Sequence, residues 1–79
     1  MRLQITHARS QANIGKVIEV NSPAVMEGKQ SKFTVTFKGK AHELRVYLDT
    51  VDERGWHSAW IEKADSKIAS YIWLYVKKI

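Results

Sequence analysis

The chain has 79 residues, of which 44% are hydrophobic and 27% are charged, and it contains no cysteine. A chain of this length forms one domain, residues 1–79, and this composition excludes an intrinsically disordered protein. The absence of cysteine excludes disulfides and thiolate metal sites, and it fits a reducing compartment. Thirteen Lys and Arg residues against eight Asp and Glu give a net charge of +5, and their uneven distribution along the chain suggests a surface with a basic side and an acidic side.

The two ends of the chain bear on cellular location. Residues 1–11 lack the apolar core of a secretory signal. The longest apolar stretch, 68–76, is far shorter than the roughly 20 residues that a membrane-spanning helix needs. We therefore expect a soluble protein of the cytoplasm that has no membrane partner.

The first part of the chain predicts two short strands followed by an irregular segment. Alternation of polar and apolar residues predicts a strand over 2–7, and β-branched residues predict a second strand over 16–20. Proline and glycine interrupt the stretch 21–31, which is therefore expected to be irregular. Its two apolar residues, Val25 and Met26, are expected to fold back over the core.

A β-hairpin is the clearest pattern in the sequence. Large apolar residues alternate with polar ones along 33–37 and again along 44–48, and Lys38, Gly39 and Lys40 separate the two arms. A period of two on both sides of a glycine turn predicts antiparallel strands with one face buried and the other exposed. The exposed face is expected to carry Lys32, Thr34, Thr36, Lys38, Lys40, Arg45 and Tyr47.

The last third of the chain predicts a charged loop over 50–55, a strand over 56–63, a turn over 64–66 and a final element over 67–79. The apolar spacing of this final element fits both a helix and a strand. Composition favours the strand, because β-branched and aromatic residues dominate and strong helix formers are few. Such a strand has aliphatic residues on one face and Tyr71, Trp73 and Tyr75 on the other.

Together these elements predict an all-β fold that is mainly antiparallel and has about five to six strands. Short strands in meander order favour a single small barrel or a strongly curved sheet. Closure of the barrel also hides the edges of so apolar a last strand. A helix at the C-terminus remains the alternative for the final element.

No motif for catalysis is present. The chain has no H-E-x-x-H, no G-x-S-x-G and no Walker glycine loop. Asp52, Glu53 and His57 lie close together, and carboxylates with an imidazole suit acid–base work or metal binding. The simpler interpretation is a solvated loop beside a strand, so we expect no enzyme activity, no metal site and no cofactor.

The charge pattern favours nucleic acid as the partner. Residues 29–45 contain five Lys or Arg residues and a single Glu. Cations and hydroxyl groups on an exposed sheet suit phosphate oxygens, and Tyr47 can stack on a base. We therefore predict a small basic module that binds single- or double-stranded nucleic acid through the hairpin face. If the last strand adjoins the hairpin, further stacking residues are Trp56, Tyr71, Trp73 and Tyr75.

Other interpretations stay open. The basic residues also fit a role in solubility, and each of Trp56, Trp60 and Trp73 fits a place in the core. In the main alternative the chain is a protein binder, an inhibitor or accessory subunit of a larger nucleic-acid-handling machine. Its interface is then the aromatic face of residues 71–75, because Trp and Tyr dominate interface hot spots. A homodimer through the same strand is a third alternative.

Overall fold

The structure is a computed structural model that describes residues 1–63 and 70–79. Within these residues it contains seven strands and one turn of 3-10 helix. The predicted turn over 64–66, and residues 67–69 of the predicted last strand, lie outside the described residues. No helix of the described chain is long and apolar enough to cross a membrane. The elements are β1 (Arg2–Ala8), η1 (Gln11–Asn13), β2 (Val17–Val20), β3 (Val25–Glu27), β4 (Gln30–Phe37), β5 (Lys40–Val46), β6 (His57–Glu62) and β7 (Tyr71–Lys78).

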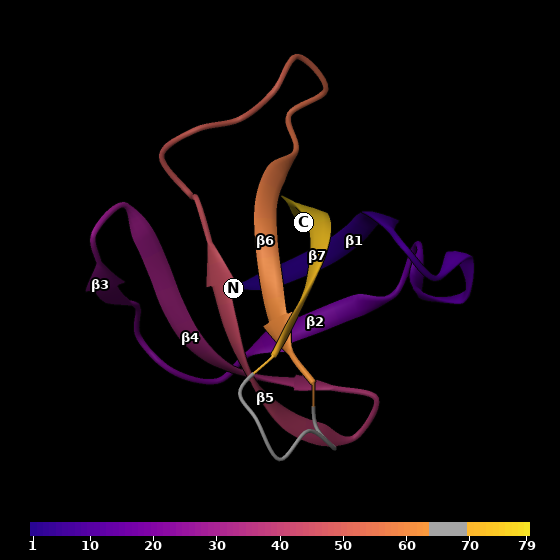
Figure 1. Ribbon diagram of the computed structural model, residues 1–79, viewed down its shortest axis with the longest axis horizontal. Coiled ribbons are helices and arrows are strands. Elements are labelled where there is room, and N and C mark those ends of the chain that lie inside the picture. Colours follow the sequence, from indigo (N-terminus) through magenta and orange to yellow (C-terminus); the bar gives the residue numbers. More distant parts are fainter. Residues whose placement is uncertain (64–69) are drawn as a thin grey trace.

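Six of these strands close into an antiparallel barrel (Figure 1). β1 pairs with β2 and β2 pairs with β4. The chain then continues as a meander through β5, β6 and β7, and β7 pairs back with β1. Within the described residues β3 lies outside this ring and pairs with β4 alone. The predicted all-β, mainly antiparallel fold is therefore confirmed, and of the two predicted forms, a small barrel or a strongly curved sheet, the protein has the barrel.

The core fills the inside of the barrel with every second residue of each strand. Leu44 on β5 shows the arrangement, because its cross-strand neighbours are Phe33 on β4 and Ile61 on β6 and all three are buried. Strict alternation sends the intervening residues to the outer wall. The buried apolar residues are Leu3, Ile5, Ala8, Ile18, Phe33, Val35, Phe37, Leu44, Val46, Ala59, Ile61, Leu74 and Val76.

The C-terminal element is a strand, as its composition predicted. Leu74 and Val76 on β7 are buried, and the alternating residues Tyr71, Trp73 and Tyr75 belong to the outer wall. Both edges of β7 are hydrogen-bonded, one to β1 and the other to β6. A homodimer that uses β7 would therefore have to form through its outer face, because neither edge is free to pair with a second chain.

The segment 21–31 differs from the prediction. Val25 and Met26 do not fold over the core: they lie in β3 and are 58% and 57% exposed. Gly28 has a φ of 63°, a left-handed conformation that glycine adopts without steric cost. The resulting turn pairs β3 with the start of β4. A glycine breaker that was expected to give an irregular loop therefore makes a second, shorter hairpin.

The antiparallel order gives the barrel two ends (Figure 1). One end holds the loop 47–56. The other end, which we call the open end, holds the β4–β5 turn and the connection from β1 to β2 that contains η1. Lys38 and Gly39 form the β4–β5 turn with φ values of 53° and 76°. Positive φ at both positions is typical of a type I′ hairpin turn, whose twist matches that of the strands.

Candidate nucleic-acid interface

The predicted hairpin face lies on the outer wall along β4 and β5, but its central cations are paired. Lys32 and Arg45 are cross-strand neighbours. Lys32 Nζ lies 3.5 Å from Glu27 Oε2 and 3.6 Å from Glu43 Oε1. The Arg45 guanidinium lies 2.9 Å and 3.4 Å from the same two carboxylates. Because two positive and two negative charges meet here, the middle of the face offers no net charge to a phosphate.

Tyr71 strengthens this ion-pair cluster. Its hydroxyl donates a hydrogen bond of 2.8 Å to Glu43 Oε2, and the Arg45 guanidinium lies 5.5 Å from the centre of its ring. The Tyr71 hydroxyl, and after it the charges of Glu27 and Glu43, raise the pKa of Arg45 against an opposing effect of partial desolvation. Arg45 is thus fully charged and engaged within the protein.

The remaining predicted residues of the hairpin divide into two groups. Thr36 and the backbone of Thr34 contact the segment between β2 and β3: Asn21 Nδ2 donates to Thr36 Oγ1 at 2.6 Å, and the Thr34 amide donates to Ser22 Oγ at 2.9 Å. Lys38 and Lys40 are exposed at the open end. Neither of these two lysines forms an ion pair with a described residue.

A continuous aromatic surface covers the outer wall of β6 and β7 and extends to β1 and to the end of β5. Trp60 on β6 lies opposite Trp73 on β7. The rings of Trp73 and Tyr75 pack edge to face with centroids 4.6 Å apart, and His7 on β1 lies 5.8 Å from Trp73. Trp73 is 39% exposed. This surface, which we call the aromatic face, consists of His7, Tyr47, Trp56, Trp60, Tyr71, Trp73 and Tyr75.

All five residues that were predicted to stack are therefore on one side of the barrel. Tyr71, Trp73 and Tyr75 alternate along β7, and Trp56 reaches them from the loop, with its ring 5.9 Å from that of Tyr75. Tyr47 joins the same surface through an edge-to-face contact of 5.5 Å with Trp60. Trp60, a core candidate on sequence grounds, is only half-buried and lies on the outer wall.

Arg54 fixes the loop beside this aromatic face. Its guanidinium lies 3.7 Å from the ring centre of Trp56 and 5.3 Å from that of Tyr75. Asp52 Oδ2 accepts hydrogen bonds from Arg54 Nε at 3.0 Å and Nη2 at 2.6 Å. Asp52 Oδ1 accepts from the backbone amides of Arg54 and Trp56. One carboxylate therefore holds both the loop backbone and the cation that covers Trp56.

We expect Asp52→Asn to change the pH dependence of stability. Hydrogen bonding from the Arg54 side chain, and then from the Trp56 amide, lowers the pKa of Asp52. A depressed folded-state pKa adds stability above the unfolded value of about 3.9, and this stability is lost as the pH falls further toward the folded-state pKa. Urea midpoints measured from pH 7 to pH 2 should therefore show a difference between wild type and Asp52→Asn that shrinks below about pH 4.

Glu53→Gln is the matched control, since Glu53 is in the same loop and its side chain has no hydrogen bond to a described residue. It should not show this acid-dependent difference. A difference between wild type and Asp52→Asn that stays constant down to pH 2 would mean that the charge of Asp52 does not stabilise the loop.

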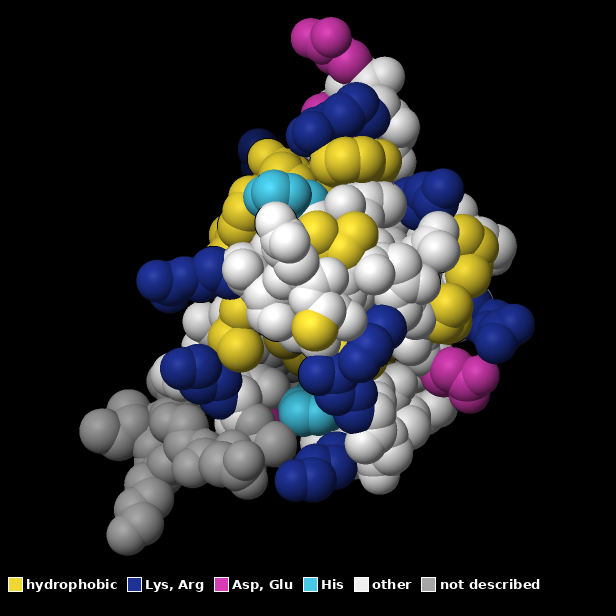
Figure 2. Space-filling view, turned by 90° about the vertical axis from the view of Figure 1, so that its right-hand side faces the viewer, with side chains coloured by type: hydrophobic (Ala, Val, Ile, Leu, Met, Phe, Trp, Pro, Cys, Tyr) yellow, Lys and Arg dark blue, Asp and Glu magenta, His cyan; other side chains and the backbone are white. Residues whose placement is uncertain are grey.

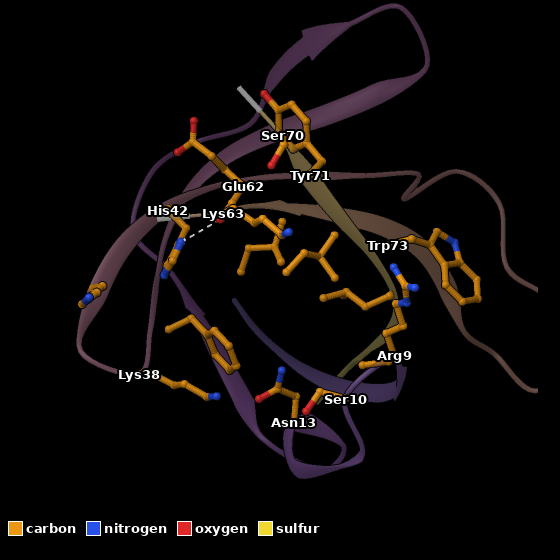
Figure 3. Close-up of a pocket in the computed structure, with 16 residues that line it drawn as sticks. Arg9, Ser10, Asn13, Lys38, His42, Glu62, Lys63, Ser70, Tyr71 and Trp73 are labelled. Atoms are coloured by element: carbon orange, nitrogen blue, oxygen red, sulfur yellow. Dashed lines mark hydrogen bonds between the residues drawn. The ribbon is translucent and has the colours of Figure 1, made fainter. Parts of the chain in front are cut away.

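A cavity of about 1150 Å³ opens at the open end of the barrel (Figure 3). Its floor is apolar and includes the core residues Phe37, Ile61 and Leu74. Its rim carries cations from three separate segments. These are Arg9 after β1, Lys38 and Lys40 at the β4–β5 turn, and Lys63 after β6.

The cations of the rim surround the cavity and come close to the aromatic face. In Figure 3, Arg9 extends beside Trp73, Lys63 extends over the cavity and Lys38 extends toward Asn13. Trp73 itself lines the cavity. Glu62 also belongs to the lining, but its carboxylate points away from the cavity (Figure 3). The cavity therefore meets the aromatic face at Trp73.

This side of the molecule is the basic side. Figure 2 shows Lys and Arg side chains distributed across it, with the acidic side chains at its margins. Partial desolvation, and then the charge of the nearby Lys16, lower the pKa of Lys38. Like charges that crowd in this way repel each other, and a bound anion would relieve the repulsion.

The residues considered for catalysis do not form a common site. His57 is buried in β6, and its Nδ1 donates to the carbonyls of Tyr47 and Thr50 at 2.9 Å and 3.0 Å. Asp52 is occupied by its own loop. Among the described residues there is no group of three His, Cys, Asp or Glu that could hold a metal ion.

Several residues of this surface were missed by the sequence analysis. Arg9 lies in a connection whose path was not predicted, and Lys63 was predicted at the end of the strand 56–63, whereas β6 ends at Glu62. No local pattern places either residue near the cavity. The position of Trp60 on the outer wall could have been predicted, because Trp60 lies on the same face of the strand as Ser58 and on the opposite face to the buried Ala59. Glu43 could also have been noticed, because it lies two residues before Arg45 and therefore on the same face of β5.

Comparison of the chain with protein-family models, with curated proteins and with solved structures found no match.

Proposed function

We propose that this protein is a non-catalytic module that binds single-stranded nucleic acid. The observation that carries the proposal is the meeting of the basic open end with the aromatic face at Trp73. Trp73 is exposed, lines the cavity and packs against Tyr75 and His7. Arg9 extends beside it (Figure 3).

This combination suits single strands better than duplexes. Proteins that bind single strands without strong sequence preference combine a basic track for the backbone with aromatic side chains on which the bases stack. The bases of a duplex are already stacked on one another, so an aromatic wall offers them little. We therefore assign phosphate contacts to Arg9, Lys38 and Lys63, and base stacking to Trp73 and Tyr75. The cytoplasm is the compartment that we propose, since the cysteine-free sequence suits reducing conditions.

The hairpin face has a smaller role in this proposal than the sequence alone suggested. Lys32 and Arg45 already pair with Glu27 and Glu43, so a phosphate would have to compete with two carboxylates for them. Lys38 and Lys40 carry no such partner among the described residues. Of the predicted hairpin cations, we retain Lys38 as a phosphate contact, because its side chain extends along the rim of the cavity toward Asn13 (Figure 3).

Fluorescence anisotropy with labelled single- and double-stranded oligonucleotides tests the proposal. We expect tighter binding of the single strand. The slope of log K against log salt concentration should be about −2, because three phosphate contacts each contribute about −0.7 on a single strand. Binding that is absent at low salt, or that prefers the duplex, would overturn the proposal.

A pair of charge-reversal variants locates the site. Lys38→Glu with Lys63→Glu should weaken binding by at least about tenfold and flatten the salt slope by more than 1, since it removes two contacts. Lys29→Glu with Lys78→Glu lowers the net charge by the same amount, but these residues lie at the opposite ends of β4 and β7 from the cavity. This control should change affinity by less than about threefold. Equal losses in the two variants would mean that net charge alone attracts the nucleic acid.

A protein partner at the aromatic face is the second candidate function. The observation that favours it is the cluster of Trp56, Arg54 and Tyr75, since Trp, Tyr and Arg are the residues most enriched in interface hot spots. This candidate predicts no salt-dependent binding of oligonucleotides. The anisotropy experiment therefore separates the two functions.

A further inference from the structure

The cavity at the open end has an apolar floor, which contacts to phosphate alone do not explain. Its floor is formed by large apolar side chains, among them Phe37, Ile61 and Leu74. Binding sites for small molecules have volumes of about 300–1,000 Å³ and combine apolar walls with a few polar groups that fix orientation. A cavity of about 1150 Å³ that is open to one side is large enough for a ligand of that class.

The polar groups around this floor are suited to an anion. Arg9, Lys38 and Lys63 come from three different connections and surround the cavity (Figure 3). None of the three forms an ion pair with a described residue. Glu62 is the one acidic side chain in the lining among the described residues, and it points away from the cavity (Figure 3). Among the described residues, an anionic group at the rim would therefore meet cations and no facing carboxylate.

His42 adds a hydrogen-bonding group between floor and rim. It is half-buried and lines the cavity. Its Nδ1 lies 2.9 Å from the backbone oxygen of Glu62, and a carbonyl oxygen can only accept, so Nδ1 carries the proton. In the neutral ring Nε2 is then an acceptor, which is suited to an amino or hydroxyl group of a ligand.

We propose that this cavity binds one nucleotide, with its base against the apolar floor and its phosphate at the cationic rim to which Arg9, Lys38 and Lys63 belong. An apolar floor excludes inorganic phosphate as the preferred ligand, and the cationic rim excludes an uncharged apolar molecule. A nucleotide has both a flat, weakly polar ring system and a phosphate. The inference deepens the proposed function and rests on it: one nucleotide of the strand enters the cavity while its neighbours stack on Trp73 and Tyr75.

NMR titration of the amide and indole signals tests this inference with adenosine 5′-monophosphate, adenosine and inorganic phosphate as separate probes. We expect adenosine 5′-monophosphate to shift signals of Arg9, His42 and Trp73, and to bind at least tenfold more tightly than either adenosine or inorganic phosphate. Equal affinity for adenosine 5′-monophosphate and inorganic phosphate would overturn the inference, because the cations alone would then account for binding.

Ser10→Trp is the variant that fills the cavity without removing a cation. Ser10 lines the cavity, is exposed, and makes no side-chain capping bond to η1. We expect this change to weaken binding of adenosine 5′-monophosphate at least tenfold. If the variant does not give the dispersed spectrum of a folded protein, Arg9→Ala provides the same readout, with an expected loss of at least threefold. Unchanged mononucleotide binding in a folded variant would overturn the inference.

The outcomes distinguish failure of this inference from failure of the proposed function. Oligonucleotide binding without any signal change from the mononucleotide would remove the cavity site and leave the single-strand proposal standing. Mononucleotide binding without oligonucleotide binding would remove the single-strand proposal and leave the cavity site standing. A linear and a circular oligonucleotide of the same sequence then identify the source of the nucleotide. Tighter binding of the linear form means that the cavity takes a strand end, whereas equal binding means that it takes an internal nucleotide.

Discussion

Leu44→Ala is expected to lower the free energy of unfolding by about 2–5 kcal/mol. Leu44 is fully buried in the middle of β5, between Phe33 and Ile61 on the neighbouring strands. Truncation removes three carbon atoms from the core and leaves a cavity that a closed ring of strands cannot easily collapse to fill. A domain of this length has a total stability of about 4–12 kcal/mol. The substitution therefore removes a large share of it.

Urea unfolding measured by circular dichroism tests this expectation, and Val25→Ala is its control. Val25 is apolar and lies in a strand, but it is exposed on β3, outside the barrel. Its truncation should change stability by no more than about 0.5 kcal/mol. Similar losses in the two variants would contradict the arrangement in which β5 lies in a closed barrel and β3 lies outside it.

The buried faces of the strands could be predicted from the sequence for a simple physical reason. Residues of β4 and β5 alternate between a dry interior and a wet exterior, so Phe33 and Leu44 identify the buried face from the sequence alone. The same argument extends to β7, where Leu74 and Val76 alternate with aromatic residues. The meander order and the apolar last strand favoured a barrel or a strongly curved sheet, and the pairing of β2 with β4 and of β7 with β1 makes it a barrel. Period-two patterns thus carried nearly all of the fold that was predicted correctly.

The segment 21–31 shows where this reasoning fails. β3 has three residues, all of them exposed, so it has no period-two pattern to recognise. It forms because Gly28 adopts a left-handed turn and because β4 offers a free stretch of edge. Neither condition is local to residues 25–27. The consequence for function is direct, because β3 brings Glu27 to Lys32 and Arg45.

Electrostatics at the site depended on these long-range contacts. Residues 29–45 have a local excess of positive charge, but ion pairing decides which of those charges are available to a phosphate. Lys32 and Arg45 are neutralised by carboxylates, one of which comes from β3. Lys38 keeps its charge free of ion pairs with described residues. The available charge is therefore shifted from the middle of the hairpin to the open end of the barrel.

The position of Arg9 beside Trp73 also depends on contacts between residues far apart in the sequence. In the register of β1 and β7, Ala8 pairs with Leu74, so the next residues along the two strands are Arg9 and Trp73. Only closure of the ring makes these two strands neighbours, although they lie at opposite ends of the sequence. A composition or periodicity argument cannot find this pair. It is nevertheless the point at which the basic and aromatic surfaces meet.

Trp73→Ala is expected to weaken single-strand binding by about 5- to 150-fold, which corresponds to the roughly 1–3 kcal/mol of one base–aromatic stack. Stability should fall by only about 1 kcal/mol, because a 39% exposed ring loses little more than its edge-to-face contacts with Tyr75 and His7. Trp73→Phe keeps an aromatic ring and should recover most of the affinity. Anisotropy with a labelled single strand and urea unfolding give the two readouts.

The outcomes of this substitution separate the three roles that the tryptophan has been given. A loss of stability of about 3–5 kcal/mol would place Trp73 in the core and would remove the aromatic face as a binding surface. An unchanged affinity with nearly unchanged stability would remove base stacking and leave a protein partner as the reason for an exposed tryptophan. A large loss of affinity that Phe restores requires a flat ring at this position, which stacking explains and the indole N–H does not.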